Sequence, residues 1–194
     1  MSSEVSKPIT TNRRHLIARR VIAPVSVACV GLSALAALSS LPAAAAGNAT
    51  VPFGSHTTSY AAGTIKPSTA QSTMDSATLA FYTKWKSRYL VSACGSGNAI
   101  TSPDADHPFV AEAQGYGLEL FALMAGADSD AQASFDSVLK FVLAHPSSIT
   151  PGLLAAEQDS SCKSVNGSDS ATDGDLAVAY GLLLADRQWG SAGA

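Results

Sequence analysis

The stretch "SDSATDGDLAVAYGLLLADRQWG", from Ser168 to Gly190, decides the fold because it predicts a long helix with a defined start and end. Thr172, followed three residues later by Asp175, has the spacing of a capping box, which predicts that the helix begins at Thr172. Gly190 is a suitable residue just beyond the last turn. Apolar residues recur at helical spacing, which predicts one buried stripe. Its expected members are Leu176, Ala179, Tyr180 and Leu183.

A second helix is predicted in residues 74–90, "MDSATLAFYTKWKSRYL". Phe81, Trp85 and Tyr89 fall at steps of four, which puts three aromatic rings on one stripe. We interpret this stripe as a core face. The alternative is that some of the rings line a groove.

Two more helices are predicted between these segments. In residues 109–127, "FVAEAQGYGLELFALMAGA", one helical face consists of Leu120, Phe121 and Met124. Residues 128–145, "DSDAQASFDSVLKFVLAH", are amphipathic, and Ser129 or Asp130 can cap them. Their apolar face consists of Phe135, Val138, Leu139, Val142 and Leu143.

The remaining segments contain no sustained strand pattern. Residues 91–108, "VSACGSGNAITSPDADHP", have the composition of turns, and residues 151–159, "PGLLAAEQD", are compatible with a short helix. About five helices joined by polar loops are therefore expected, which predicts an all-α fold.

The N-terminus has the pattern of a secretory signal peptide over residues 1–46. A basic segment precedes an alanine-rich apolar run that ends in small residues. Arg13 and Arg14 resemble a twin-arginine signal, but Asn12 precedes them, so general secretory export remains open. A cleavable signal fits this pattern better than a membrane anchor. Residues 47–72, rich in Ser, Thr and Ala, are expected to form a flexible leader before a domain at 73–194.

The charge of the expected mature protein argues against a nucleic-acid partner. The first 46 residues hold five of the twelve Lys and Arg and one of the fifteen Asp and Glu. Seven basic and fourteen acidic side chains remain, whereas phosphate binding requires an excess of Lys and Arg.

Two cysteines remain after the expected cleavage, because Cys29 lies in the apolar run. Cys94 and Cys162 lie in polar, loop-like surroundings and could form a disulfide in an oxidising compartment. The alternative is two independent buried thiols, and we favour the disulfide.

Two carboxylates open the last predicted helix. Acidic residues in a first turn complement the helix dipole, which accounts well for Asp175. Gly174 is less expected, since a glycine costs about 1 kcal/mol relative to alanine inside a helix. It allows either a close approach to the backbone or free projection of the neighbouring Asp173.

A third carboxylate, Glu112, lies in the motif "AEAQGYG" at 111–117. Two glycines around Tyr116 are unfavourable for a helix interior, which indicates a functional site. Carboxylates at helix starts, together with nearby aromatic rings, suggest carbohydrate chemistry, because sugars stack on aromatic faces.

Three segments carry a resemblance to glycoside hydrolase family 8. "FVAEAQGYGLELFALMAGAD" resembles the family's "SEGQGYGM" region, and "SATDGDLAVAYGLLLADRQWG" resembles its signature, in which A-T-D-G-D opens a helix. "FYTKWKSRYL" resembles its first helix. The similarity extends from Thr73 to Gly190 in the same order.

The resemblance implies a double ring of six inner and six outer helices, and inverting hydrolysis of β-1,4-linked polysaccharide without a cofactor or metal. Glu112 matches the proton donor. Asp173 matches the signature aspartate, which we assign to sugar binding and distortion because inversion forms no covalent intermediate. Tyr116 and Gln114, from the same motif as Glu112, are assigned to substrate binding.

The family's catalytic base lies downstream of the signature, so this chain is expected to be the N-terminal portion of an incomplete (α/α)6 toroid that lacks its base. The expected function is a secreted endo-β-1,4-glucanase. The alternatives are a chitosanase or another β-glycanase of the family, and a non-catalytic glycan-binding fragment or gene remnant. We expect a β-1,4-glucan or chitosan as the partner, no nucleic acid and no stable membrane anchor.

Overall fold

The computed structural model describes residues 49–95, 97–150, 152–166 and 169–190. The expected signal peptide and Cys29 lie outside these residues. The described helices are α1 (Gln71–Tyr89), α2 (Ala111–Leu123), α3 (Ala131–Ala144) and α4 (Thr172–Trp189). The described strands are β1 (Leu90–Ser92), β2 (Asn98–Ile100), β3 (Phe109–Val110) and β4 (Glu157–Gln158).

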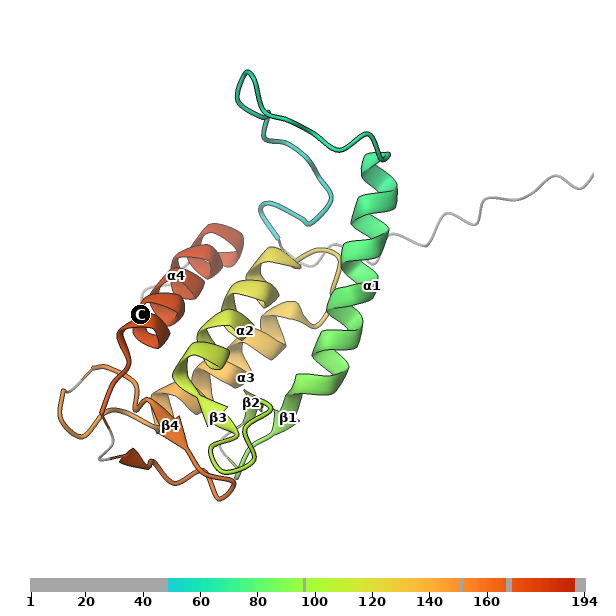
Figure 1. Ribbon diagram of the computed structural model, residues 1–194. Helices are drawn as coiled ribbons and strands as arrows, with labels where there is room; N and C mark the ends of the chain where they lie inside the picture. Colours follow the sequence, from blue (N-terminus) through green and yellow to red (C-terminus); the bar gives the residue numbers. More distant parts are fainter. Residues whose placement is uncertain (1–48, 96, 151, 167–168, 191–194) are drawn as a thin grey trace, which may run out of the picture. The chain divides into compact units, whose positions relative to one another are not determined.

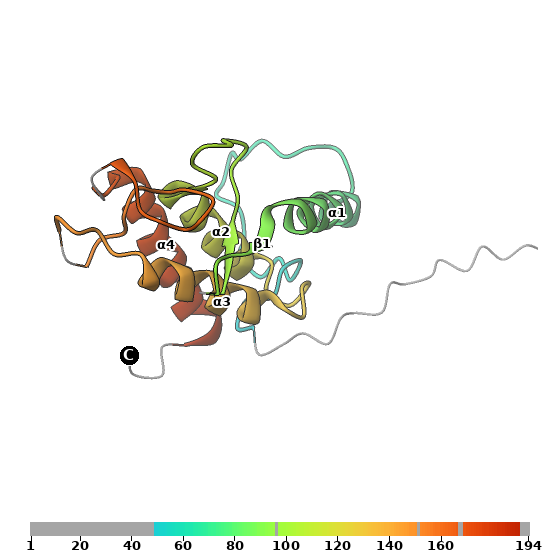
Figure 2. The same cartoon turned by 90° about the horizontal axis from the view of Figure 1, so that it is seen from below.

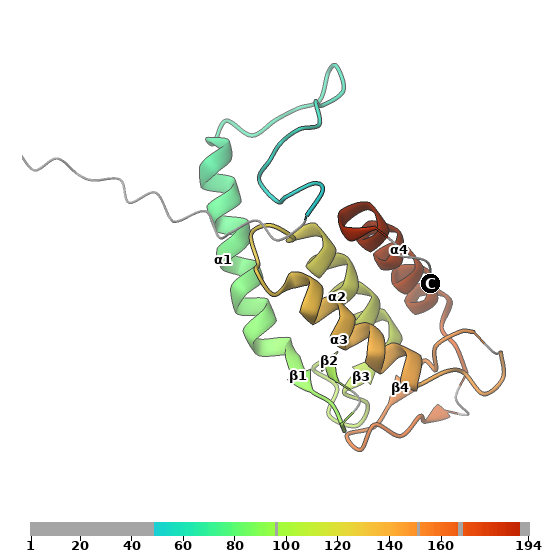
Figure 3. The ribbon, with the colours of Figure 1, turned by 180° about the vertical axis from the view of Figure 1, so that it is seen from behind.

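Helix α2 occupies the centre of the helical group, between α1 and α4, and α3 covers one side of it (Figures 1, 2 and 3). Leu118 and Phe121 of α2 are completely buried, as is Val138 of α3. The aromatic rings of Tyr82 and Trp85 reach from α1 to Phe121, with centroid distances of 6.5 and 5.9 Å. The core therefore forms around α2.

Glycines allow α2 and α4 to pack backbone to backbone. A Cβ atom added to Gly174 would lie 2.4 Å from the Cβ of Ala111, and one added to Gly115 would lie 2.4 Å from the Cβ of Ala177. Gly181 approaches Leu118 in the same way. These successive contacts run in the same chain direction on both helices, so the two helices are parallel and begin at the same end of the molecule (Figure 1).

This close packing makes the predicted buried stripe of α4 wrong. Leu176 and Leu183 are 65% and 68% exposed, and Tyr180 and Ala179 are also exposed. The buried positions of α4 are Gly174, Ala177, Gly181 and Gln188. Small side chains face α2 because the short distance between the helices leaves no space for leucine or tyrosine.

Two other predicted faces require smaller corrections. On α1, Phe81 is 74% exposed, and the buried aromatic is its neighbour Tyr82, while Trp85 and Tyr89 pack against the core as expected. On α3, Leu143 is exposed and Phe141 is completely buried. In each case one member of the predicted stripe lies at its edge and faces away from the core.

The described residues contain four helices and two small sheets, so the prediction of an all-α fold with about five helices holds only for the dominant structure. Strands β1 and β2 form an antiparallel hairpin in which Leu90 pairs with Ile100. Strands β3 and β4 pair through Phe109 and Gln158, so the short helix expected at 151–159 is absent from the described part of that segment. Strands of two or three residues are too short to show an alternating pattern.

A disulfide joins the β1–β2 hairpin to the loop after β4. Cys94 and Cys162 have an S–S distance of 2.07 Å and are 68 residues apart in the sequence. The expected pair is therefore formed in the structure.

The segment before α1 is attached to the C-terminal end of α4. The backbone N–H of Val51 donates to Oε1 of the buried Gln188, whose amide donates to the carbonyls of Val51 and Ala122. Phe53 packs against the core. Part of the segment expected as a flexible leader is thus held by hydrogen bonds.

A hydrogen-bonded group around Asp128 connects α1 to the loop between α2 and α3. Oδ2 of Asp128 accepts hydrogen bonds from the Tyr82 hydroxyl at 2.5 Å and the Lys86 ammonium at 2.7 Å. Burial alone would raise the pKa of Asp128, but the hydrogen bonds from Lys86 and Tyr82 outweigh it and hold the pKa below its usual value. In the same group, burial raises the pKa of Tyr82 far above its ordinary value.

Candidate active site

The two predicted carboxylates lie at the same end of the α2–α4 pair. Glu112 is the second residue of α2, and Asp173 is the second residue of α4. A Cβ atom on Gly174 would lie 2.9 Å from the backbone nitrogen of Glu112, so the two helix starts are in direct contact. Parallel packing through glycine therefore brings both carboxylates to one end of the molecule.

Tyr116 connects to Glu112 one turn along α2. Its hydroxyl donates to Oε1 of Glu112 at 2.7 Å. This hydrogen bond, followed by the charge of Glu112, raises the pKa of Tyr116, and the charges of Glu119 and Asp173 act in the same direction. Glu112 and Asp173 thus both contribute to the negative potential at this hydroxyl.

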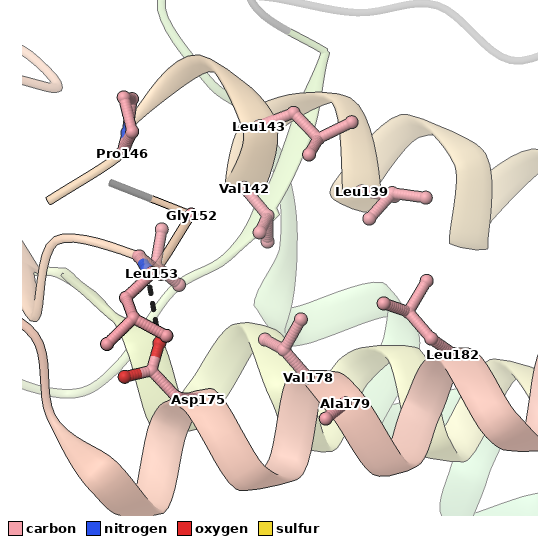
Figure 4. Close-up of a pocket in the computed structure, with 11 residues that line it drawn as sticks. Leu139, Val142, Leu143, Pro146, Gly152, Leu153, Asp175, Val178, Ala179 and Leu182 are labelled. Carbon is pink, nitrogen blue, oxygen red and sulfur yellow. Dashed lines mark hydrogen bonds between the residues drawn. The ribbon is translucent and has the colours of Figure 1, made fainter. Parts of the chain in front are cut away.

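The two carboxylates in the first turn of α4 have different partners. Oδ1 of Asp173 accepts the N–H of Gly174 at 2.8 Å, and the Asp173 residue is exposed. Oδ1 of Asp175 accepts the N–H of Leu154 at 3.1 Å, and it lies beside an apolar cavity between α3 and α4 (Figure 4). Helix α4 begins at Thr172 as predicted, but the capping box is not formed, because the N-cap residue is Ala171 and no side-chain hydrogen bond is made at that position. Asp175 instead fixes the segment before β4.

The assignment of Gln114 to substrate binding is wrong. Gln114 is completely buried, its Oε1 accepts the N–H of Ile100 at 2.8 Å, and its amide donates to the carbonyls of Ile100 and Val110. These bonds fix β2 and the end of β3 against the first turns of α2. Gln114 therefore holds the surroundings of Glu112 in place and has no access to a ligand.

The glycines around Tyr116 have a packing role that the sequence did not reveal. Gly115 contacts α4, and a Cβ atom on Gly117 would lie 2.4 Å from Cγ1 of Ile100. Gly174 also has a packing role, because the group that comes close to its backbone is α2 and not a ligand.

A cavity of about 250 Å³ opens beside Glu112. Its walls come from α1, from the loop after β2 and from α2, and they include Trp85, Tyr89 and Tyr116. Sequence reasoning did not place the α1 aromatics at this site. Their stripe was the only available signal, and its main interpretation was a core face.

The apolar cavity between α3 and α4 has a volume of about 270 Å³ and offers less chemistry (Figure 4). Its walls are mostly aliphatic, including Leu139, Val142 and Leu182, and Asp175 is its one acidic group. Within the described residues, no group of three or more His, Cys, Asp or Glu side chains could hold a metal ion. No helix in the described part of the chain is long and apolar enough to cross a membrane.

Residues 60–194 match the family model described as glycosyl hydrolases family 8. The chain is 47% identical over 143 residues to a beta-glucanase of Niallia circulans, an alignment that covers 73% of this chain and 34% of that protein. It is 40% identical over 141 residues to an endoglucanase of Bacillus sp. (strain KSM-330), covering 68% of this chain and 30% of that protein.

Among solved structures, the chain resembles the apo structure of a beta-1,3-1,4-glucanase from Paenibacillus sp. X4. The TM-score is 0.65 at 46% sequence identity, and the match covers 71% of this chain and 36% of that chain. The chain thus spans about one third of the length of the relatives that it matches.

Proposed function

The chain belongs to glycosyl hydrolases family 8, and from that premise we propose that it carries the proton donor and the sugar-holding carboxylate of an inverting β-glucanase. The bond cleaved is the β-1,4 glycosidic bond of a β-glucan. The observation that carries this proposal is the common location of Glu112 and Asp173, at the adjoining starts of two parallel helices.

Glu112 is the proposed general acid. A glycosidic oxygen is a poor leaving group until it is protonated, so a positioned carboxylic acid accelerates its departure. Tyr116 donates to Oε1 of Glu112 and thereby fixes the orientation of the carboxyl group. The other oxygen, Oε2, is the atom from which the proton would pass to the substrate.

Asp173 is proposed to bind and distort the sugar at the cleavage point. Inversion requires a water molecule between acid and base, with the two carboxyl groups roughly 6.5–9.5 Å apart, and it forms no glycosyl-enzyme intermediate. Asp173 is exposed and accepts the N–H of Gly174, which holds its carboxylate at the helix start. A hydrogen bond to a sugar hydroxyl suits this position better than nucleophilic attack does.

The catalytic base is proposed to belong to the part of the fold that the match does not include. The matched region corresponds to about one third of the relatives, and the resemblance places the base downstream of the Asp173 motif. The complete (α/α)6 toroid is proposed on the same grounds. Residues 60–194 tested without that part should therefore hydrolyse glucan very slowly.

The substrate proposed first is a mixed-linkage β-1,3-1,4-glucan. The support is the 46% identity to a beta-1,3-1,4-glucanase and the 47% identity to a beta-glucanase. Carboxymethylcellulose tests the cellulase alternative, and chitosan tests the chitosanase alternative. We also propose export from the cell, because the Cys94–Cys162 disulfide suits an oxidising compartment.

The experiment is a chimera in which residues 60–194 replace the matched third of the Niallia circulans beta-glucanase. Release of reducing ends from the three polysaccharides is measured for the chimera and for its Glu112→Gln variant. We expect the substitution to lower kcat by about 10²–10⁴-fold on polysaccharide. The matched control is Glu119→Gln, two turns further along α2, which should retain nearly full activity. Equal activity of the chimera and its Glu112→Gln variant would remove Glu112 from the acid role.

A further inference from the structure

We infer that Asp175, the second aspartate in the first turn of α4, is a positioning residue for Glu112. The inference rests on the proposed function for the role of Glu112 as the proton donor. Asp175 acts through residues 153–156, which we call the bridging segment. This segment is hydrogen-bonded to the first turn of α4 at one point and to the first residue of α2 at another.

Asp175 fixes the bridging segment from the side of α4. Its Oδ1 accepts the N–H of Leu154 at 3.1 Å, at the edge of the apolar cavity (Figure 4). Leu154 is 4% exposed, and the next residue, Ala155, is completely buried. A backbone N–H at a buried position is costly to leave without an acceptor, so loss of the Asp175 oxygen should displace the segment.

The same segment holds the first residue of α2. The carbonyl of Ala156 accepts the N–H of Ala111 at 2.9 Å, and Ala111 directly precedes Glu112. The N–H groups of a first helical turn have no acceptor within their own helix, and no side-chain hydrogen bond caps α2. The Ala156 carbonyl supplies one such acceptor, so the location of the bridging segment determines where α2 begins.

Further backbone bonds make the bridging segment a stiff connection. The N–H of Ala155 donates to the carbonyl of His145 at 2.9 Å, and the N–H of Ala156 donates to the carbonyl of Asp169 at 2.6 Å. A segment held at consecutive residues cannot absorb a displacement by bending locally. A change at the Asp175 contact is therefore passed on to the start of α2.

The hydrogen bond of Asp175 and its interaction with the helix dipole can be separated by substitution. The dipole of α4 requires a negative charge, whereas the N–H of Leu154 requires only an acceptor oxygen. Asparagine keeps the acceptor and removes the charge, and alanine removes both. A positioning role therefore predicts that Asp175→Asn is active and that Asp175→Ala is impaired.

The kinetic test uses the chimera on mixed-linkage glucan. Asp175→Ala should lower kcat by about tenfold or more, because a misplacement of about 1 Å can cost up to about 100-fold, and it should leave KM nearly unchanged. Asp175→Asn should restore most of kcat. On a dinitrophenyl β-glucoside oligomer, whose phenolate departs without protonation, the alanine variant should lose much less activity. The matched control, Asp136→Ala on the exposed side of α3, should behave like the parent.

Amide exchange in the full chain follows the same connection without any substrate. Asp175→Ala should accelerate exchange of the N–H groups of both Leu154 and Ala111, whereas Asp175→Asn should leave both close to the parent. Circular dichroism establishes that each variant is folded. If Asp175→Ala unfolds, Asp175→Glu replaces it, since the added methylene displaces the acceptor while the charge is kept, and kcat on glucan should again fall.

The outcomes separate this inference from the proposed function. A parent-like kcat in Asp175→Ala, an equal loss on both substrates, or an asparagine variant as impaired as the alanine variant would each overturn the inference. If Glu112→Gln leaves hydrolysis unchanged but Ala111 exchange responds to Asp175→Ala, the positioning of the α2 start is supported and the acid assignment is refuted. If Glu112→Gln abolishes hydrolysis but Asp175→Ala changes neither kcat nor exchange, the acid assignment remains and the inference is refuted.

Discussion

Replacing Gly115 by alanine tests the close packing of α2 and α4, which positions both carboxylates. The new Cβ would lie 2.4 Å from the Cβ of Ala177 and 2.8 Å from the backbone nitrogen of Val178. Ordinary carbon contacts are about 3.5–4.0 Å, so the helices would have to separate by roughly 1 Å. Because part of this contact is with backbone atoms, a change of side-chain rotamer cannot relieve it.

The magnitude follows from two opposing effects. Overpacking of a tight interface costs about 3 kcal/mol at the upper end of its usual range. Alanine gains about 1 kcal/mol over glycine in helix propensity, which leaves a net loss of about 2 kcal/mol. For a chain of this size such a loss lowers Tm by about 4–8 °C.

The assay is thermal unfolding monitored by circular dichroism at 222 nm, together with urea unfolding. The control is Ala80→Gly on the exposed side of α1. At this position only the helix preference for alanine over glycine applies, so the substitution should destabilise the protein by about 1 kcal/mol. Gly181→Ala should cost less than Gly115→Ala, because its new Cβ would lie 2.8 Å from Leu118. A Gly115→Ala variant as stable as the parent, or more stable, would refute the close packing.

Three further predictions concern stability. Replacing both Cys94 and Cys162 by serine should lower the free energy of unfolding by about 4 kcal/mol, because the disulfide joins residues 68 positions apart. The parent protein in the presence of reductant should then have the same urea midpoint as this double serine variant. The pKa of Asp128 is lower in the folded protein than in the unfolded chain. The stability that the Asp128 carboxylate contributes is therefore fully present at pH values above the unfolded pKa of about 3.9, and it is lost as the pH falls through the folded pKa. Asp128→Asn should therefore lower the urea midpoint at pH 7 and have little effect at the lowest pH where the parent stays folded; an equal loss at both would contradict this. Gln188→Ala should release the segment around Val51, visible as faster amide exchange there, and unchanged exchange would show that other contacts hold it.

Sequence periodicity predicted best the helix whose buried face consists of large apolar residues. In α3, Phe135, Val138 and Val142 are buried as expected. These residues fill the space between helices at ordinary separation, which is the situation that the hydrophobic pattern describes.

The same reasoning failed for α4 because its partner lies too close for large side chains. The pattern assigned Leu176, Tyr180 and Leu183 to the core, whereas Gly174 and Gly181 occupy it. The small residues recur at helical spacing, so a signal was present. Its interpretation required knowing that α2 offers Ala111 and Gly115 in matching register, and the sequence of one helix does not contain that information.

The arrangement of the candidate site was predicted only in part. The motifs proposed Glu112 and Asp173 as site residues, and the structure places their two helix starts in contact. The burial of Gln114 was not foreseen, because its hydrogen bonds go to Ile100 and Val110 in the short strands β2 and β3, which the sequence pattern did not reveal. The aromatic cavity depends on how α1 packs beside α2, and a single helical stripe does not specify that arrangement.

The proton-donor role of Glu112 is tested most directly by its dependence on the leaving group. The chimera with Glu112→Ala is compared with its parent on mixed-linkage glucan and on a dinitrophenyl β-glucoside oligomer, whose phenolate departs without protonation. We predict a loss of about 10²–10⁴-fold in kcat on the glucan and a loss of less than about tenfold on the dinitrophenyl substrate. An equal loss on both substrates, or no loss on either, would contradict the role of Glu112 as the acid.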